Sequence, residues 1–262
     1  MKGQIRNVLI TGASGNIGTV LHDGLSADFR LRLTDVKPVE FLRDGEEQVL
    51  CDLRDFDHVL QAMEGMDAVV HLGGIPHEAP FEDILAVNII GTRNVYEAAR
   101  LQGVKRVVFA SSNHAIGFEP MDSFPDSSAL FRPDTHYGIS KVFGESLGRM
   151  YHDRYGLEVV CQRIGTFAET PTEMRHLCTW ISFRDMVQLT RVCLNHPNPG
   201  FAIVYGLSGN TRNFADNRLA EQMGYHPQDN AEAFLSELLS AGHDLSELKV
   251  LRIGGSFAEP AL

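Results

Sequence analysis

Short apolar runs alternate with longer amphipathic stretches between residues 7 and 163. Such runs are typical of buried parallel strands, which show little alternation because both faces of the sheet are covered. They lie at residues 7–11, 31–35, 48–53, 67–72, 106–112 and 158–163. Between them, apolar residues recur at helical spacing, which predicts helices at residues 19–25, 55–63, 81–99 and 139–155. This alternation predicts an α/β fold, a doubly wound parallel sheet with helices on both faces.

Composition narrows the class of protein. Apolar residues make up 44% and charged residues 22% of the 262 residues, as in a globular protein that buries a sizeable core. The net charge of −11 disfavours a nucleic-acid partner, and no apolar run is long enough for a membrane-spanning helix. The four cysteines form no C-x-x-C pair. We therefore expect reduced thiols in a cytoplasmic protein, and neither a disulfide framework nor a metal site.

A glycine-rich loop joins the first strand to the first helix. Gly12, Gly15 and Gly18 are spaced G-x-x-G-x-x-G, and Asn16 and Ile17 lie between the last two. Glycines in this pattern permit a tight turn, close approach to a pyrophosphate and close packing of helix on strand. The helix N-terminus adds N–H groups and a positive dipole end. The loop predicts a dinucleotide site, although a glycine-rich turn without a ligand remains the alternative; the absence of Gly-Lys-Ser/Thr excludes a Walker A loop.

Residues at the ends of the next strands extend the predicted dinucleotide site. Asp35 ends the second strand, where a carboxylate accepts hydrogen bonds from the ribose hydroxyls of NAD and repels the 2′-phosphate of NADP. An ordinary turn aspartate is the alternative, and nearby Lys37 and Arg43 leave the preference open. The further candidates are Asp52 for the adenine amino group, Leu53 for the adenine ring, and Gly73 and Gly74 for close backbone approach.

The regular alternation ends after Arg163. Loops and short helices over the ligand crevice are predicted for residues 164–180, then a helix at 183–194, a strand at 201–205 and helices at 217–223 and 231–239. We therefore predict an NAD-binding Rossmann core in residues 1–163 and a small C-terminal substrate cap in residues 164–262. Elements of the second part are expected to return to the core, so that the chain forms one compact unit.

Tyr137 and Lys141 lie four residues apart at the start of a predicted helix, which places them on one face. A lysine ammonium beside a phenol favours the phenolate, so Tyr137 can serve as a base near neutral pH. A pair that merely shares an exposed helix face is the alternative, because Y-x-x-x-K alone is a weak pattern.

Polar side chains follow the fifth strand. In a doubly wound sheet the carboxyl ends of the strands face the ligand crevice, so Ser112, Asn113 and His114 are expected to point at a substrate. A turn serine and a loop histidine with satisfied hydrogen bonds are the alternatives for Ser112 and His114. Asn88, in the long helix before this strand, is predicted to tie neighbouring backbone together.

The chain resembles the extended short-chain dehydrogenase/reductase family over nearly its whole length. The motifs that carry the resemblance are Thr11-Gly12-Ala13-Ser14-Gly15-Asn16-Ile17-Gly18, Asp52-Leu53, His71-Leu72-Gly73-Gly74, residues 88–94, Ser111-Ser112 and Tyr137-Gly138-Ile139-Ser140-Lys141. The resemblance implies that Tyr137 is the acid/base, that Lys141 lowers its pKa and holds the nicotinamide ribose, and that Ser112 positions the reacting oxygen. It also implies that NAD is the cofactor, and adds Leu72, Ser111, Ile164 and Phe167 to the residues that bind it.

Within this family, the sequence is similar to the uronate dehydrogenases. The similar stretches are residues 71–75, 80–85, 109–117, 163–165, 175, 177–180 and 229–234. The similarity implies that Ser112, Asn113 and His114 contact a sugar. It also implies that Arg175 grips the sugar carboxylate, for which a guanidinium is suited. A surface salt bridge is the alternative role for Arg175.

Three residues depart from the pattern of the uronate dehydrogenases. Pro76 stands where a substrate-contacting serine is expected, and it offers neither a hydroxyl nor an N–H. Thr166 replaces a second serine and keeps the hydroxyl, and Phe167 is bulkier than expected. Pro76, Thr166 and Tyr137 complete the predicted substrate site, and the departures leave the exact sugar open.

The predicted reaction is NAD-dependent oxidation at C1 of a pyranose hexuronate, such as glucuronate or galacturonate, to an aldarolactone, with Tyr137 as base. The first alternative is a nucleotide-sugar epimerase or dehydratase that keeps its NAD bound. Against it, the 99 residues from 164 to 262 leave little room for a nucleotide-diphosphate pocket. A non-catalytic NAD-sensing regulator is the second alternative, and it has no need of the tyrosine, lysine and serine. We expect a homo-oligomer, because the apolar tail at residues 256–262 can dock on another subunit.

Overall fold

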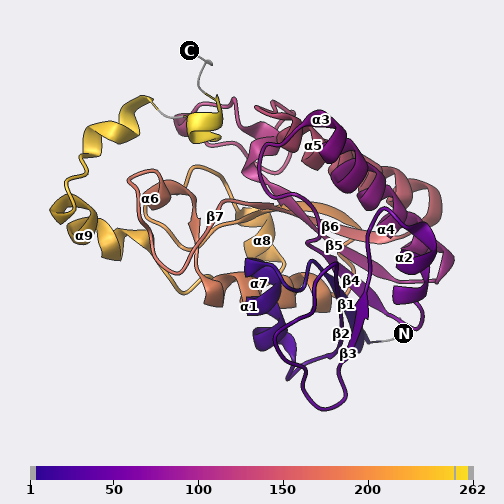
Figure 1. Ribbon diagram of the computed structural model, residues 1–262. Coiled ribbons are helices and arrows are strands. Elements are labelled where there is room, and N and C mark those ends of the chain that lie inside the picture. The colour runs from indigo at the N-terminus through magenta and orange to yellow at the C-terminus, as the bar shows by residue number, and fades with distance from the viewer. Residues whose placement is uncertain (1–3, 251, 259–262) are drawn as a thin grey trace.

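A seven-stranded parallel sheet forms the centre of the computed structural model, which describes residues 4–250 and 252–258 (Figure 1). In spatial order the strands are β3 (Glu47–Leu50), β2 (Arg30–Asp35), β1 (Asn7–Thr11), β4 (Ala68–His71), β5 (Arg106–Ser112), β6 (Glu158–Ile164) and β9 (Phe201–Gly206). The strand order reverses between β1 and β4, and such a switch point is where open α/β sheets bind ligands. The predicted doubly wound fold is confirmed.

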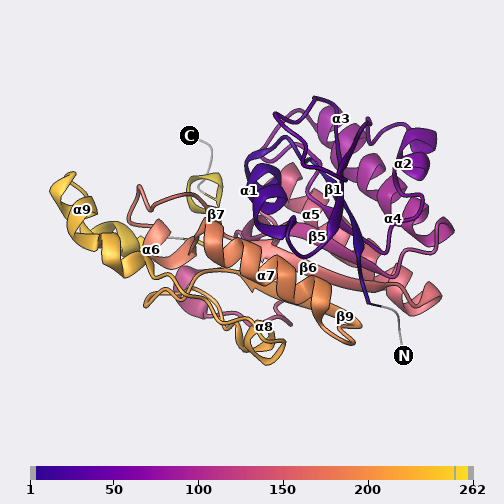
Figure 2. The ribbon, with the colours of Figure 1, turned by 90° about the horizontal axis from the view of Figure 1, so that it is seen from below.

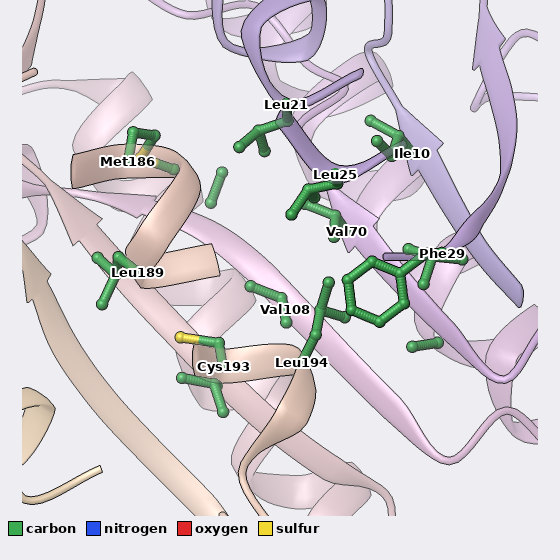
Figure 3. Close-up of a cluster of buried hydrophobic side chains, with 14 of the residues drawn as sticks. Ile10, Leu21, Leu25, Phe29, Val70, Val108, Met186, Leu189, Cys193 and Leu194 are labelled. Atoms are coloured by element: carbon green, nitrogen blue, oxygen red, sulfur yellow. The ribbon is translucent and has the colours of Figure 1, made fainter. Parts of the chain in front are cut away.

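Helices cover both faces of this sheet. On one face lie α1 (Asn16–Leu25) and α7 (Phe183–Asn195), and on the other lie α2 (Phe56–Ala62), α4 (Gly91–Leu101) and α5 (His136–Tyr155) (Figure 2). Figure 3 shows Leu21 and Leu25 of α1 facing Met186 of α7 over the sheet residue Val108. A second apolar cluster fills the opposite face. Because both faces are buried, the strands appear in the sequence as nearly continuous apolar runs.

The predicted helix at residues 81–99 contains a π-helical segment that the sequence did not reveal. In the structure this predicted helix consists of α3 (Phe81–Asp83), the π-helix η1 (Ile84–Ile90) and α4. η1 carries Asn88, whose Oδ1 accepts the N–H of Ile75 at 2.8 Å and whose Nδ2 donates to the Ile75 carbonyl at 3.0 Å. Nδ2 also donates to Ser140 Oγ of α5 at 3.1 Å. The prediction that Asn88 ties neighbouring backbone together is confirmed.

Residues after Arg163 divide between the sheet and a smaller region beside it. β9 extends the sheet next to β6, and α7 packs against α1. The region beside the sheet contains β7 (Thr166–Phe167), α6 (His176–Thr179), β8 (Trp180–Ile181), α8 (Arg218–Gln222), η4 (Ala231–Phe234), α9 (Leu235–Ser240) and η5 (Leu245–Val250) (Figure 1). Because β9 and α7 contribute to the core, the predicted boundary at Arg163 does not separate two independent bodies.

The chain then returns to the carboxyl end of β5. Backbone hydrogen bonds join Ile253 to Glu119 and Gly254 to Gly117, at 2.9 Å each. The 3₁₀ turns of this area are η2 (Asn113–Ile116), η3 (Met121–Ser123) and η6 (Gly255–Ala258). Residues 259–262 of the predicted apolar tail lie outside the described residues. We refer to residues 252–258 as the C-terminal segment.

One strand ends earlier than predicted. β3 stops at Leu50, because a turn begins at Asp52, whose carbonyl accepts the N–H of Asp55 at 3.0 Å. Asp52 and Leu53 therefore lie in the loop after β3 rather than on the strand. This loop still brings both residues to the carboxyl edge of the sheet, where they line a cavity.

Candidate active site

A cavity of about 790 Å³ lies at the carboxyl ends of the central strands. Its lining includes all the residues that the sequence predicts to bind the cofactor: Gly12, Gly15, Asn16, Ile17, Gly18, Asp35, Asp52, Leu53, Leu72, Gly73, Gly74, Ser111, Tyr137, Lys141, Ile164 and Phe167. The predicted substrate residues divide into two groups. Pro76, Ser112 and Tyr137 line the cavity, whereas Asn113, His114, Thr166 and Arg175 do not.

The glycine loop forms a cradle with no room for side chains. Gly12 has a positive φ of 69°, and a Cβ on Gly18 would lie 2.3 Å from the Gly12 carbonyl oxygen. A Cβ on Gly12 would lie 2.7 Å from the N of Gly73, so the loops after β1 and β4 are in close contact. No side chain among the described residues caps the N-terminus of α1, and its first turn has no acidic residue. These features fit a pyrophosphate held by backbone N–H groups.

Two carboxylates line the cavity beside β2 and β3. Asp35 accepts the N–H of Ser14 at 3.0 Å and that of Val36 at 2.7 Å, so its carboxylate is fixed at the end of β2. Asp52 is gripped by Arg54 through Nε, at 3.0 Å, and Nη2, at 2.6 Å, and this hydrogen bonding lowers the pKa of the Asp52 carboxyl. Arg54 lines the cavity as well. The carboxylate of Asp52 would therefore have to bind both Arg54 and the adenine amino group that we expect it to contact.

Tyr137 and Lys141 lie in the first turns of α5, one above the other. Thr135 caps this helix, and its hydroxyl accepts a backbone N–H of the first turn at 2.9 Å. The Nζ of Lys141 lies 5.3 Å from the centroid of the Tyr137 ring and donates to the Ala110 carbonyl at 2.8 Å. Both side chains are buried. The alternative in which the pair merely shares an exposed helix face is therefore wrong.

Burial dominates the electrostatics of this pair. It raises the pKa of Tyr137 to about 12, although a hydrogen bond with Ser112 acts in the lowering direction. Burial also lowers the pKa of Lys141 to about 8. The lysine thus does not by itself produce the phenolate that we expected from the sequence. A positive charge beside Tyr137 would oppose the effect of burial and lower its pKa.

Two of the predicted substrate residues outside the cavity lining donate to one backbone carbonyl of the C-terminal segment. Asn113 Nδ2 donates to the Ile253 carbonyl at 2.9 Å, and Arg175 Nη2 donates to the same oxygen. Arg175 Nη1 donates to Thr166 Oγ1 at 3.3 Å, and its buried Nε has no acceptor among the described residues. No acidic side chain of the described residues pairs with Arg175, so the surface salt bridge is wrong as an alternative.

His114 stands between the tyrosine and the C-terminal segment. Its Nδ1 lies 2.8 Å from Oδ2 of Asp134, whose side chain is fully buried. Its ring meets the ring of Tyr137 edge-on at a centroid distance of 5.7 Å, and the ring of Phe257 at 5.2 Å. His114 therefore has a satisfied hydrogen bond on one side of its ring and contacts the predicted base on another.

Sequence reasoning missed several residues of this site: Arg54, Ile75, Glu78, Asp134, Ile253 and Phe257. Glu78 accepts the N–H of Tyr137 at 2.9 Å and so helps to cap α5. The available signal for the C-terminal segment was the doublet Gly254-Gly255, since adjacent glycines indicate a close approach. A Cβ on Gly255 would lie 2.8 Å from Arg175 Nε.

Comparison with known proteins identifies the family. A model of the NAD dependent epimerase/dehydratase family matches residues 8–183. The chain belongs to this family. Uronate dehydrogenase from Pseudomonas putida is 47% identical over 229 residues, which are 87% of this chain and 85% of that enzyme. The predicted resemblance to the extended short-chain dehydrogenase/reductase family and, within it, to uronate dehydrogenases is confirmed.

Solved structures of this family extend the similarity to the three-dimensional level. Uronate dehydrogenase from Agrobacterium tumefaciens is 41% identical, with a TM-score of 0.93 over 98% of this chain and 97% of that one. A variant of the Agrobacterium tumefaciens enzyme in complex with NAD gives the same TM-score over 98% of both chains. The family model ends at residue 183, whereas these structures match nearly the whole chain. The similarity therefore extends beyond the residues that the family model matches.

Proposed function

We propose that this protein oxidises C1 of a pyranose hexuronate, such as glucuronate or galacturonate, to an aldarolactone, with NAD as cofactor. The observation that carries the proposal is the half-buried guanidinium of Arg175, which donates to Thr166, between the cavity residues Gly165 and Phe167, and has no acidic partner among the described residues. A protein with a net charge of −11 needs such a local positive group to hold an anionic sugar. The similarity to uronate dehydrogenases supports the same conclusion.

The residues of the cavity account for the chemistry. NAD, when bound, supplies the nicotinamide that accepts a hydride from C1 and a positive charge near the phenol. Tyr137 takes the proton of the C1 hydroxyl, and Ser112, which shares a hydrogen bond with Tyr137, positions that hydroxyl. Lys141 stabilises the phenolate through its ammonium, 5.3 Å from the ring centroid. Loss of one hydride and one proton converts the hemiacetal carbon to the lactone carbonyl.

The substrate carboxylate is expected at Arg175. In the structure this side chain donates to the Ile253 carbonyl and to Thr166. Its buried Nε has no acceptor in the described part of the chain, and a carboxylate oxygen would satisfy this donor. Asn113, which donates to the same carbonyl, is expected to contribute an amide to the sugar once the C-terminal segment adjusts to the bound ligand. Phe167, which lines the cavity, stacks on Phe183 at a ring-centroid distance of 4.8 Å.

A substrate panel tests the proposal directly. Hexuronates, neutral aldoses, sugar alcohols and nucleotide sugars are each mixed with the protein and NAD, and the absorbance of NADH is followed. We expect turnover with hexuronates alone. Turnover of a neutral sugar without turnover of any hexuronate would contradict the uronate assignment. Reaction restricted to nucleotide sugars, with NAD retained on the purified protein, would instead indicate the epimerase or dehydratase alternative.

The same assay with an Arg175→Leu variant tests the carboxylate role. A charge-assisted hydrogen bond to a substrate is worth about 1.5–3 kcal/mol, so KM for the hexuronate should rise about tenfold or more. The turnover number should change much less, because Arg175 is distant from the hydride. Arg218→Leu, which removes an exposed arginine paired with Asp216, is the matched control and should leave KM unchanged. An unchanged KM for Arg175→Leu would remove its assigned role.

We also propose that the protein is a cytoplasmic homo-oligomer. Exposed apolar side chains on neighbouring helical elements support the assembly: Phe81, Leu85, Ile90, Ile139 and Met150. Sedimentation as a monomer at micromolar concentration would contradict it.

All four cysteines are buried free thiols, which suits a reducing compartment. No helix of the described residues is long and apolar enough to span a membrane. Cell fractionation would test the location.

A further inference from the structure

Asp134 is a buried carboxylate that is hydrogen-bonded to a histidine. Its side chain is fully buried in the loop before α5. Oδ2 lies 2.8 Å from Nδ1 of His114, and Oδ1 accepts the hydroxyl of Thr135 at 3.0 Å. No lysine or arginine of the described residues forms an ion pair with it. A buried carboxylate is costly unless its oxygens are hydrogen-bonded, so the contact with His114 is a principal stabilising interaction of this group.

Three glycines from separate segments leave the space that this carboxylate occupies. A Cβ on Gly117 would lie 1.9 Å from Asp134 Oδ2, and a Cβ on Gly254 would lie 1.8 Å from the same oxygen. A Cβ on Gly138, in the first turn of α5, would lie 3.1 Å from Oδ1. The segment after η2, the helix of Tyr137 and the C-terminal segment thus all give way to Asp134. The pair with His114 is therefore built into the packing around the predicted base.

The contact with Asp134 favours one tautomer of His114. An ionised carboxylate only accepts hydrogen bonds, so Nδ1–H is the donor to Asp134. In the neutral ring, Nε2 then presents a lone pair. No group among residues 4–250 and 252–258 makes a hydrogen bond to Nε2, and 16% of the side chain is exposed. Because the ring touches Tyr137, a sugar that presents its C1 hydroxyl to the base also comes within reach of His114.

We propose that Asp134 is a positioning residue, which holds His114 as the Nδ1–H tautomer so that Nε2 accepts a hydrogen bond from a sugar hydroxyl beside Tyr137. The inference deepens the proposed function and rests on it. It assigns different substrate groups to His114 and Arg175. A lone pair at Nε2 of His114 favours a hydroxyl, whereas the guanidinium of Arg175 favours the carboxylate. The site then selects a sugar that carries both groups.

A double-mutant cycle tests whether Asp134 acts through His114. The parameters kcat and KM for a hexuronate are measured with saturating NAD for the unaltered protein, Asp134→Asn, His114→Ala and the double variant. We expect Asp134→Asn to raise KM about tenfold and to change kcat less than about threefold, the effect of one hydrogen bond. In the His114→Ala background the same substitution should change KM less than about twofold. An equal rise of KM in both backgrounds would overturn the proposal, because Asp134 would then act independently of His114.

A matched control uses the second buried pair of a histidine and a carboxylate. His22 Nε2 and Glu46 Oε2 lie 2.7 Å apart between α1 and the loop after β2. Glu46→Gln makes the same change of a carboxylate to an amide away from the substrate residues, and KM for the hexuronate should stay within about twofold. If the unaltered protein turns over no hexuronate, the proposed function fails. If it does turn them over but the cycle is additive, only the role of Asp134 fails.

Nuclear magnetic resonance reads the tautomer without any turnover. Long-range ¹H–¹⁵N correlation spectra distinguish Nδ1–H from Nε2–H rings, and the signal of His114 is identified by its loss in the His114→Ala variant. We expect the Nδ1–H form of His114 in the unaltered protein and a gain of the Nε2–H form in Asp134→Ala. A neutral Nε2–H ring in the unaltered protein would overturn the proposal, even if the variants failed to fold.

Discussion

At the scale of single residues, the buried charge of Lys141 lowers the stability of the free protein. Its ammonium is buried, and among the described residues it donates to a backbone carbonyl and not to a carboxylate. Burial lowers the pKa of this lysine from 10.5 to about 8. Each unit of pKa shift corresponds to about 1.4 kcal/mol, so the charged form costs the free protein roughly 3 kcal/mol at pH 7.

We therefore expect Lys141→Met to stabilise the free protein while turnover is lost. The free energy of unfolding at pH 7 should rise by about 1–3 kcal/mol, since relief from the buried charge exceeds the loss of one hydrogen bond. The folded-state pKa is lowered, so the penalty is complete below pH 8 and disappears as the pH rises from about 8 to 10.5. Urea unfolding of both proteins at pH 7 and pH 10 measures this, and the difference should shrink at pH 10.

Lys105→Met is the control for this prediction. Lys105 is an exposed lysine that pairs with Asp67, so its removal should lower the free energy of unfolding by no more than about 1 kcal/mol. Equal or lower stability of Lys141→Met at pH 7 would contradict the buried-charge argument.

The sequence predicted that Tyr137 and Lys141 share a helix face, because the spacing of four fixes it. It could not predict their burial, which depends on β5 and on the loop after β4.

At the scale of elements, strands were easier to predict than their connections. The bounds of β1 and β5 match the sequence prediction, because strands covered on both faces stand out as apolar runs. The π-helix η1 leaves no such pattern, because its sequence around Asn88 is equally compatible with a regular α-helix. The result is a clamp between elements. η1 holds Ile75, which lines the cavity, and joins it to Ser140 of α5.

Removing this clamp should weaken ligand binding as well as the fold. Asn88→Ala deletes three hydrogen bonds, two of them to the backbone of Ile75. At about 1 kcal/mol each, we expect the free energy of unfolding to fall by about 2–3 kcal/mol. KM for NAD should rise severalfold because the loop that carries Ile75 is released. Denaturant titration and initial-rate kinetics give the two values.

Asn210→Ala separates the local effect from the general one. Asn210 is a buried asparagine outside the cavity lining that donates to the Trp180 carbonyl and accepts the N–H of Ala231. Its loss should cost similar stability and leave KM for NAD unchanged. If both variants raised KM alike, destabilisation and not the clamp at Ile75 would explain the result.

At the scale of the whole molecule, the two halves of the site are assembled differently. The cofactor half follows the chain in order, with Gly12, Asp35, Asp52 and Gly73 at the ends of successive strands or in the loops directly after them. Local motifs therefore predicted these four residues directly, whereas Leu72, Ser111, Ile164 and Phe167 came from the family resemblance. The substrate half joins segments far apart, since the contact between Asn113 and Ile253 spans 140 residues. No local pattern encodes such a contact. Strand ends predicted Ser112, Asn113 and His114, and the family resemblance added Arg175, but neither revealed Asp134 or Ile253.

Because the cofactor half spans the strands of the core, dinucleotide binding should stabilise the whole chain. NAD at 100 times its Kd should raise the free energy of unfolding by about 2.7 kcal/mol, or Tm by roughly 5–10 °C. NADP at the same concentration should raise Tm less, because the fixed carboxylate of Asp35 repels its 2′-phosphate. Asp35→Asn should narrow the gap, whereas Asp23→Asn, an exposed aspartate on α1, should not. Equal shifts of Tm with both dinucleotides in the unaltered protein would show that the charge of Asp35 is outweighed by nearby cations such as Arg54.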